Sequence, residues 1–217
     1  LVDIYLDGIN IEADINKAIF YLEKGIELND TNSMIKLASI YETNKYVSKN
    51  YPKAFELYLK ASQADNSFAL YRVGQYYRNG LAVKQDFQKA IEYFRRASNL
   101  GNSDALFDLG VRYIKGEGVN KSISTAYGLW MKAADGGNLK AQYNLAVAYE
   151  NGKAIEKNLT LALKYYELAA NQNEIKSIEY CFKAYTIGAG TDKNYVKAQY
   201  YLDLKIQYYL DLKKKNS

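Results

Sequence analysis

One tyrosine recurs every 36 residues along this chain, and that spacing constrains the fold more than any other feature. The tyrosines are Tyr5, Tyr41, Tyr77, Tyr113, Tyr149 and Tyr185. An alanine keeps the same step, as Ala18, Ala54, Ala90, Ala126, Ala162 and Ala198. Positions that return at a fixed period, without insertion or deletion, are typical of proteins built from stacked structural repeats. We therefore expect a repeat array and not a single globular core.

Two series of capping residues predict two helices in each copy. The first series is Asp30, Asn66, Asn102, Asn138 and Glu174, and the second is Asp14, Asn50, Asp86, Ser122, Asn158 and Asn194. Short polar side chains of this kind accept hydrogen bonds from the unpaired N–H groups at a helix start. In the central copy, this register predicts helices near residues 103–115 and 123–135.

A glycine follows the first helix of most copies. It stands as Gly8, Gly80, Gly116, Gly152 and Gly188, and only Asn44 departs from the series. Glycine closes helices freely in the left-handed conformation. The next hydrophobic residue (Val83, Val119 or Ile155) is expected to pack under the turn. A phosphate-binding loop is disfavoured, because no strand precedes the glycine and no Gly-Lys-Ser/Thr follows it.

Helical spacing predicts which side of each helix is buried. In the central copy the first helix should bury Ala105, Leu106, Leu109 and Tyr113, with Gly110 permitting close helix contact. The second helix should bury Ala126, Leu129, Trp130, Ala133 and Ala134. The aromatic residue at Phe94, Trp130 or Tyr166 should fill the space between successive pairs. One pair cannot bury both faces alone, so stacked pairs are expected to share a continuous core.

Composition argues against catalysis. The chain has no histidine, the commonest general base and metal ligand. Its one cysteine, Cys181, occupies the repeat position of Leu109 and Leu145, which favours a buried structural thiol over a nucleophile. Asp and Glu are expected at solvent-facing positions, with no convergent carboxylate pair. We predict a protein that is not an enzyme, without catalytic, cofactor or metal-ligating residues.

The central copy resembles the Sel1-like repeat, a relative of the tetratricopeptide repeat. The matching residues are Ala105, Leu109, Gly110, Tyr113, Gly116, Gly118, Val119, Ala126, Trp130, Ala133, Ala134 and Gly137. The resemblance implies an all-α, right-handed superhelix (solenoid) of 36-residue helix-turn-helix repeats, whose first helices line a concave surface.

We expect one solenoid over residues 1–212, followed by a basic tail at 213–217. It comprises a partial first copy (1–29), repeats at 30–65, 66–101, 102–137 and 138–173, and a terminal capping copy (174–212). Because the sequence begins inside a repeat, we also expect it to be part of a longer protein.

The resemblance further implies a non-catalytic scaffold or adaptor that binds a peptide or a folded protein on its concave face. The expected partner-binding positions are Tyr71, Gln75, Arg78, Phe107, Val111, Ile114, Tyr143, Val147, Glu150 and Lys183. Rigid aromatic residues beside a few charges are common anchors of protein interfaces. The alternative is that these aromatic residues pack between adjacent first helices as ordinary core.

The sequence leaves two other functions open. Some relatives of the Sel1-like family are immunity proteins that cover a toxic enzyme, and no residue here separates that role from a general scaffold. Single-stranded RNA could stack on the aromatic residues. Against RNA, three of the five formal positive charges belong to Lys213, Lys214 and Lys215, and Glu42 and Glu150 lie among the expected binding positions. No run approaches the ~20 apolar residues that a membrane-spanning helix needs.

Overall fold

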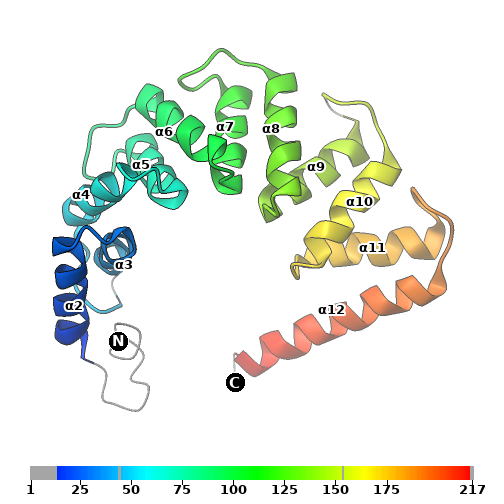
Figure 1. Cartoon of the computed structure of the whole chain (residues 1–217). Coiled ribbons are helices and arrows are strands. Elements are labelled where there is room, and N and C mark those ends of the chain that lie inside the picture. Colours follow the sequence, from blue (N-terminus) through cyan, green and yellow to red (C-terminus); the bar gives the residue numbers. More distant parts are fainter. Residues whose placement is uncertain (1–13, 44, 153, 216–217) are drawn as a thin grey trace. The chain divides into compact units, whose positions relative to one another are not determined.

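The computed structural model describes residues 14–43, 45–152 and 154–215, and these ranges contain 11 α-helices and no strand (Figure 1). The helices are α2 (Ile15–Glu27), α3 (Thr31–Glu42), α4 (Tyr51–Ser62), α5 (Ser67–Asn79), α6 (Phe87–Asn99), α7 (Ser103–Lys115), α8 (Ile123–Asp135), α9 (Leu139–Asn151), α10 (Leu159–Ala170), α11 (Ile175–Ile187) and α12 (Tyr195–Lys215). The expected all-α fold class is confirmed. Tyr5, Gly8 and Asn44 lie outside the described residues.

The chain divides into two compact units. Unit 1 runs up to Ala105 and includes the loop Gly116–Asn120, while unit 2 holds Leu106–Lys115 and the chain from Lys121 onward. Within each unit, helices that follow one another along the chain pack together. The closest pairs are α3 with α4 and α5 with α6 in unit 1, and α9 with α10 and α11 with α12 in unit 2.

All eleven predicted capping residues lie immediately before a helix and accept a hydrogen bond from a backbone N–H in its first turn. The bounds of α7 and α8 coincide with the helices predicted for the central copy. Glu174 caps α11 although its side chain is longer than that of a usual cap. Its Oε2 accepts from both the backbone N–H and the hydroxyl of Ser177, each at 2.6 Å.

The loop inside each copy is closed by a backbone hydrogen bond to the repeated tyrosine. The carbonyls of Tyr41, Tyr77, Tyr113, Tyr149 and Tyr185 accept from the N–H of the residue that caps the next helix, at 2.8, 2.9, 3.0, 2.9 and 2.9 Å. Between these groups Gly80, Gly116, Gly152 and Gly188 adopt φ values of 67°, 73°, 68° and 80°. The predicted left-handed role of the loop glycine is therefore confirmed in the described copies.

Two of these loops also contact the copy before them. A Cβ on Gly118 would lie 2.7 Å from the carbonyl oxygen of Phe87, the first residue of α6. A Cβ on Gly190 would lie 2.3 Å from the carbonyl oxygen of Leu159, the first residue of α10. These loops therefore lie directly on the start of the preceding second helix, within unit 1 and within unit 2 respectively.

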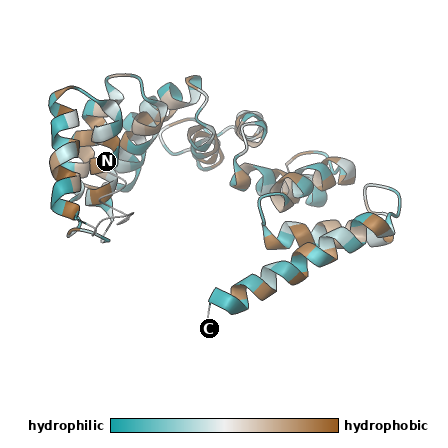
Figure 2. Ribbon diagram, turned by 60° about the horizontal axis from the view of Figure 1, so that its bottom comes forward, coloured by the Kyte–Doolittle hydropathy of each residue, from teal (hydrophilic) through white to brown (hydrophobic). Residues whose placement is uncertain are grey.

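The core is made from small residues and rings in register. The repeated alanines Ala54, Ala90, Ala126 and Ala162 have no exposed surface, and Phe94, Trp130 and Tyr166 are buried beside them, as predicted. In both units, hydrophobic residues recur along the helices between hydrophilic ones (Figure 2).

The repeated tyrosine stacks on a tyrosine of the second helix in three copies. The ring centroids of Tyr77 and Tyr93, Tyr149 and Tyr165, and Tyr185 and Tyr201 are 5.7, 5.9 and 5.9 Å apart, and their planes differ by 15°, 4° and 6°. One residue thus contributes its carbonyl to the loop and its ring to the contact between the paired helices.

Helix α12 differs from the others. It has 21 residues, and only Ala198 and Tyr201 among them are buried. Its last residues are Lys213, Lys214 and Lys215, so the lysines of the expected tail are helical. Lys205 stands where other copies have alanine and forms an ion pair of 2.9 Å with Glu179 of α11. Across the described ranges, no helix is both long enough and apolar enough to cross a membrane.

Two glycines of unit 2 give a matched test of this packing. A Cβ on Gly110 of α7 would lie 2.6 Å from the Trp130 ring and 3.1 Å from the carbonyl oxygen of Ala126, whereas a Cβ on Gly128 of α8 would meet nothing within 4 Å. Gly110→Ala should therefore destabilise the protein by about 1–3 kcal/mol through overpacking. Gly128→Ala should stabilise it by about 0.5–1 kcal/mol, because alanine favours the helix.

Urea unfolding followed by circular dichroism measures both changes. If the two variants changed the free energy of unfolding in the same direction, the close contact between α7 and α8 would be contradicted.

Candidate partner-binding faces

The predicted binding positions lie on first helices of both units. Tyr71, Gln75 and Arg78 lie on α5 in unit 1, and we call them the α5 face. In unit 2, Phe107, Val111 and Ile114 lie on α7, Tyr143, Val147 and Glu150 on α9, and Lys183 on α11. We call the unit 2 set the α7–α9 face. All ten side chains are half-buried except that of Lys183, which is exposed.

The apolar residues of the α7–α9 face share the core of unit 2. Phe107, Val111, Ile114, Tyr143 and Val147 all pack against the same buried cluster, with part of each side chain still exposed. The Phe107 ring stacks on Trp130 with centroids 5.5 Å apart, and the indole N–H of Trp130 donates to the Phe107 carbonyl at 3.1 Å. The Tyr143 ring meets Tyr166 edge-on at 6.1 Å. Both rings therefore contact the core, although the partners shown here, Trp130 and Tyr166, lie on second helices and not on the adjacent first helices of the expected alternative.

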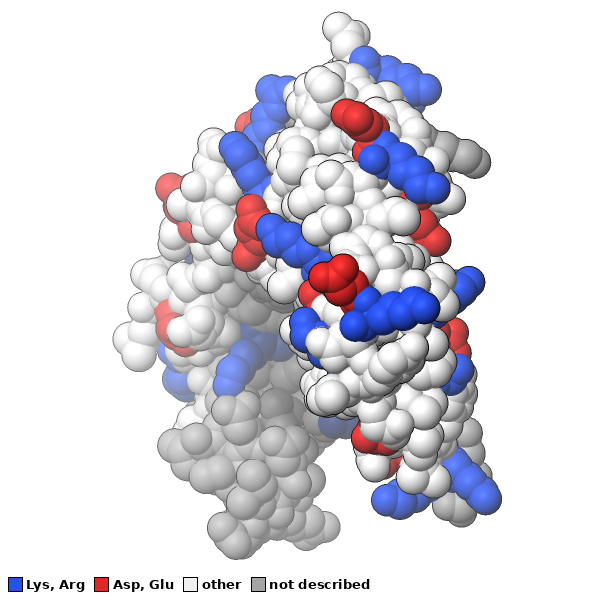
Figure 3. Space-filling model, turned by 90° about the vertical axis from the view of Figure 1, so that its right-hand side faces the viewer, with Lys and Arg blue, Asp and Glu red and all other residues white. Residues whose placement is uncertain are grey.

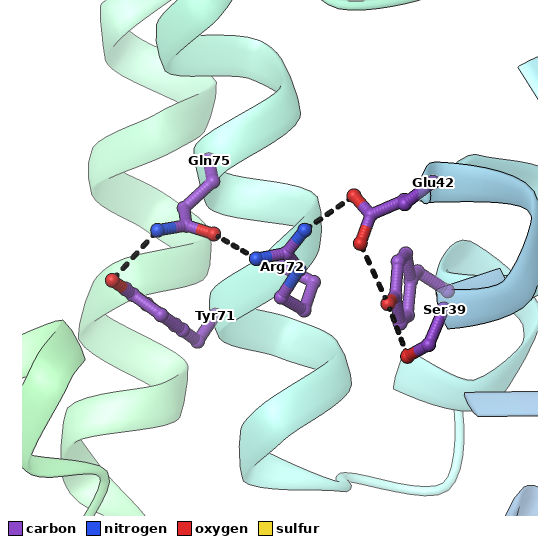
Figure 4. A network of polar contacts seen from close by, with 6 residues as sticks. Ser39, Glu42, Tyr71, Arg72 and Gln75 are labelled. Atoms are coloured by element: carbon purple, nitrogen blue, oxygen red, sulfur yellow. Dashed lines mark hydrogen bonds and ion pairs between the residues drawn. The ribbon is translucent and has the colours of Figure 1, made fainter. Parts of the chain in front are cut away.

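The α5 face is polar, and its side chains are tied into a network that begins on α3 (Figure 4). The carboxylate of Glu42 pairs with the guanidinium of Arg72. This guanidinium also donates to the side-chain amide oxygen of Gln75 at 2.8 Å. The Gln75 amide in turn donates to the Tyr71 hydroxyl at 2.7 Å. The network fixes the orientation of Tyr71 and Gln75, two of the predicted binding residues.

The other carboxylate oxygen of Glu42 accepts from the hydroxyl of the buried Tyr58 at 3.0 Å. The Ser39 hydroxyl lies 3.0 Å from the same tyrosine oxygen, and the Arg72 guanidinium lies over the Tyr58 ring at 5.4 Å. The network thus joins α3 and α4 of one copy to α5 of the next, all within unit 1.

Unit 2 repeats part of this arrangement at the same repeat positions. The Tyr166 hydroxyl donates to Glu150 at 2.6 Å, and Tyr166 follows Glu150 by the same number of residues as Tyr58 follows Glu42. At the position of Arg72, the ring of Tyr180 stacks on Tyr166 at 3.9 Å. Glu150, a predicted binding residue, is therefore also a hydrogen-bond acceptor for the core.

These contacts differ from the expectation that Asp and Glu occupy solvent-facing positions. That expectation is wrong for Glu42, Glu150 and Glu167, which are half-buried acceptors, and for Asp108, which is buried. The available signal was the common spacing from Glu42 to Tyr58 and from Glu150 to Tyr166.

Burial sets the protonation of the tyrosines in these networks. It raises the pKa of Tyr58 to about 12, with the nearby charge of Glu42 adding to the effect and the Ser39 hydrogen bond opposing it. Burial, followed by the hydrogen bond to Glu150, raises the pKa of Tyr166 as well. Both hydroxyls therefore keep their protons at neutral pH and act as donors to the glutamates.

Cys181 is buried, as predicted for a structural thiol. Burial, with the charge of Glu167 adding to it, raises the pKa of the thiol to about 12, so it is not a nucleophile at neutral pH. Among the residues that the structure describes, no group of His, Cys, Asp and Glu could hold a metal ion.

Charges of both signs are interspersed on the face shown in Figure 3. Lys and Arg side chains alternate there with Asp and Glu, without a continuous basic stripe. Binding of a nucleic-acid backbone would favour such a stripe.

Helical pairs closed by the same loop in successive copies define a helical-repeat protein. The Sel1 repeat model matches residues 3–30, 31–66, 67–102, 103–138, 139–174 and 178–204. The chain belongs to the Sel1 repeat family, as the resemblance indicated. Sel1 repeats typically mediate protein–protein interactions, and the family is generally non-catalytic.

Solved structures share the fold. A Sel1 repeat protein from Oxalobacter formigenes is 23% identical with a TM-score of 0.88, over 94% of this chain and 59% of that one. A protective antigen present in uropathogenic Escherichia coli strains is 23% identical with a TM-score of 0.82, over 96% of this chain and 44% of that one. An immunity protein from Pseudomonas aeruginosa is 25% identical with a TM-score of 0.59, over 88% of this chain and 73% of that one.

The chain spans 59% and 44% of the first two of these structures. A comparison with curated proteins gives no match.

The raised pKa of Tyr58 makes stability depend on pH in the alkaline range. The folded chain retains a proton that an unfolded tyrosine, with an ordinary pKa of 10.0, has lost. The resulting stabilisation is present in full below pH 10 and is lost as the pH rises through about 12. The free energy of unfolding of the wild-type chain should therefore fall more steeply from pH 10 to 12 than that of Tyr58→Phe.

Urea titrations at several pH values measure this difference. Tyr195, which is 68% exposed, supplies the control, since Tyr195→Phe should follow the wild type. Parallel curves for the wild type and Tyr58→Phe would contradict the assignment.

Proposed function

We propose that this chain is a non-catalytic scaffold that binds a protein partner through its first-helix faces, chiefly the α7–α9 face. The observation that carries the proposal is a set of five apolar side chains on α7 and α9 that keep exposed surface while packing on one core. Such residues form a surface that is apolar and held in place before binding, which lowers the entropy lost on association.

The surroundings of the α7–α9 face suit a protein partner. Glu150 on α9 and the exposed Lys183 on α11 add one charge of each sign to this face. An apolar centre with a polar rim is the usual composition of a protein interface. Because Glu150 is fixed by Tyr166, its carboxylate would meet a partner in a defined position. Membership of the Sel1 repeat family supports the same function.

A second candidate is an immunity protein that covers a toxic enzyme. The structural likeness to the Pseudomonas aeruginosa immunity protein, at a TM-score of 0.59, favours this version of the scaffold role. It uses the same kind of surface and differs only in the partner. Single-stranded RNA has less support, because the α7–α9 face has Glu150 beside Tyr143 and only Lys183 as a cation.

A binding test should spare the rings, because removing Phe107 or Tyr143 would remove more core contact than a change at the smaller Val147, which packs on the same cluster. The double variant Val147→Asp/Lys183→Glu changes the α7–α9 face and keeps both aromatic rings. We expect it to lose the partner that the wild-type chain captures from its native extract, with at least a tenfold loss of affinity once that partner is purified.

The matched control is Met131→Asp/Lys164→Glu, which makes the same chemical changes on the second helices α8 and α10, where Met131 is 36% exposed and Lys164 is exposed. It should keep the partner. Equal loss in both double variants, at equal stability in urea, would contradict a role for the α7–α9 face. The identity of the captured protein separates a toxin from another partner.

A further inference from the structure

Unit 1 contains an apolar cavity that the repeat does not account for. It has a volume of about 330 Å³ and is lined by Ile35, Lys36, Ser39, Ile40, Thr43, Lys45, Tyr46 and Phe68. These residues come from α3, from the loop that follows it, and from the start of α5. A cavity of this volume is at the small end of the range for ligand sites.

The cavity lies where the sequence departs from its own repeat. Asn44 replaces the loop glycine found as Gly80, Gly116, Gly152 and Gly188 in the other copies. Phe68, in the next copy, stands at a position where the other copies have Asn32, Asp104, Lys140 and Lys176, and its side chain is 43% exposed. Stacking of the copies needs neither change, and departures from a consistent local pattern are expected at functional sites.

The apolar wall is held in place by the network of unit 1. The Phe68 ring meets the Tyr58 ring edge-on, with centroids 6.2 Å apart. Tyr58 is fully buried and is hydrogen-bonded to Glu42. Ser39, which lines the cavity, also lies within hydrogen-bond distance of the Tyr58 hydroxyl. An apolar side chain entering the cavity would therefore meet a surface that is already ordered.

Two lysines line the cavity. Among its described lining residues, Lys36 and Lys45 are the charged ones, and both are exposed. The Lys45 ammonium lies 4.5 Å from the centroid of the Tyr46 ring, at the apolar lining. Complementary charge beside an apolar anchor is what gives such a site its specificity.

We propose that this cavity binds a peptide segment in which a large apolar side chain is flanked by acidic residues. The apolar side chain would enter between Phe68, Ile35 and Ile40, and the carboxylates would lie against Lys36 and Lys45. This inference rests on the proposed protein-binding function and gives it a site on α3 and the start of α5 in unit 1. The peptide experiment and the partner-capture experiment change different residues, so the failure of one is distinguishable from the failure of the other.

Three short fluorescein-labelled peptides test the assignment with the full chain. They have the same flanking residues and contain Asp-Phe-Asp, Asn-Phe-Asn or Asp-Ser-Asp at the centre. Fluorescence polarisation at low ionic strength should show binding of Asp-Phe-Asp and about tenfold weaker binding of Asn-Phe-Asn. The peptide with Asp-Ser-Asp should not bind measurably, because it lacks the anchor.

Variants locate the binding. Lys36→Glu/Lys45→Glu should weaken binding of the Asp-Phe-Asp peptide at least tenfold, and Phe68→Ser should do the same. The matched control is Lys49→Glu/Lys60→Glu, which changes the net charge equally at exposed residues of unit 1 outside the cavity lining. This control should bind like the wild type.

Three results would overturn the proposal. They are no binding of any peptide, equal binding of the Asp-Phe-Asp and Asn-Phe-Asn peptides, and equal loss in the two lysine double variants. Urea unfolding of each variant shows whether a loss of binding comes from a loss of fold.

Discussion

The fold of each copy depends on one backbone hydrogen bond, from the N–H of the capping residue to the carbonyl of the repeated tyrosine. In the central copy it joins Ser122 to Tyr113 at 3.0 Å, and four other copies have the same bond. It fixes where the second helix starts relative to the end of the first. In four of these copies a left-handed glycine reverses the chain without a steric penalty, and the Tyr41–Asn50 bond forms in the copy that has Asn44 at that position. Helix packing and the proposed partner-binding faces both follow from this fixed start of the second helix.

Most of the fold could be predicted from the sequence, because its determinants are local and recur. Capping side chains, loop glycines and small residues each act within a few positions, so the bounds of α7 and α8 follow from register alone. The candidate site was less predictable, since its contacts join different copies. The spacing from Glu42 to Tyr58 recurs, but nothing in the sequence near Glu42 shows that its carboxylate also pairs with Arg72 of the next copy. The cavity beside Phe68 was likewise missed, because it depends on a ring that belongs to the next copy.

The same repeat position serves different chemistry in different copies. At the position of Glu42 and Glu150, two copies place a carboxylate that accepts from a buried tyrosine. The copy that has Trp130 in place of that tyrosine has Ile114 in place of the glutamate. The indole of Trp130 donates to the Phe107 backbone carbonyl, so it needs no carboxylate. The core thus helps to decide the chemistry of the surface.

This coupling limits how such a scaffold can change its partner. Phe107 and Tyr143 are placed by Trp130 and Tyr166, so replacing either ring costs core packing as well as surface. Replacing Val147 or Lys183 removes less core packing, because these side chains are not aromatic. Lys36, Lys45 and Phe68 lie at positions where the copies have polar, charged or apolar residues alike. A new binding specificity therefore costs the least stability when it arises at the edges of the faces or in loops such as the one after α3. At the cavity of unit 1, stacking of the copies constrains the identity of the residues least. The chemistry of the proposed ligand can therefore determine which residues stand there.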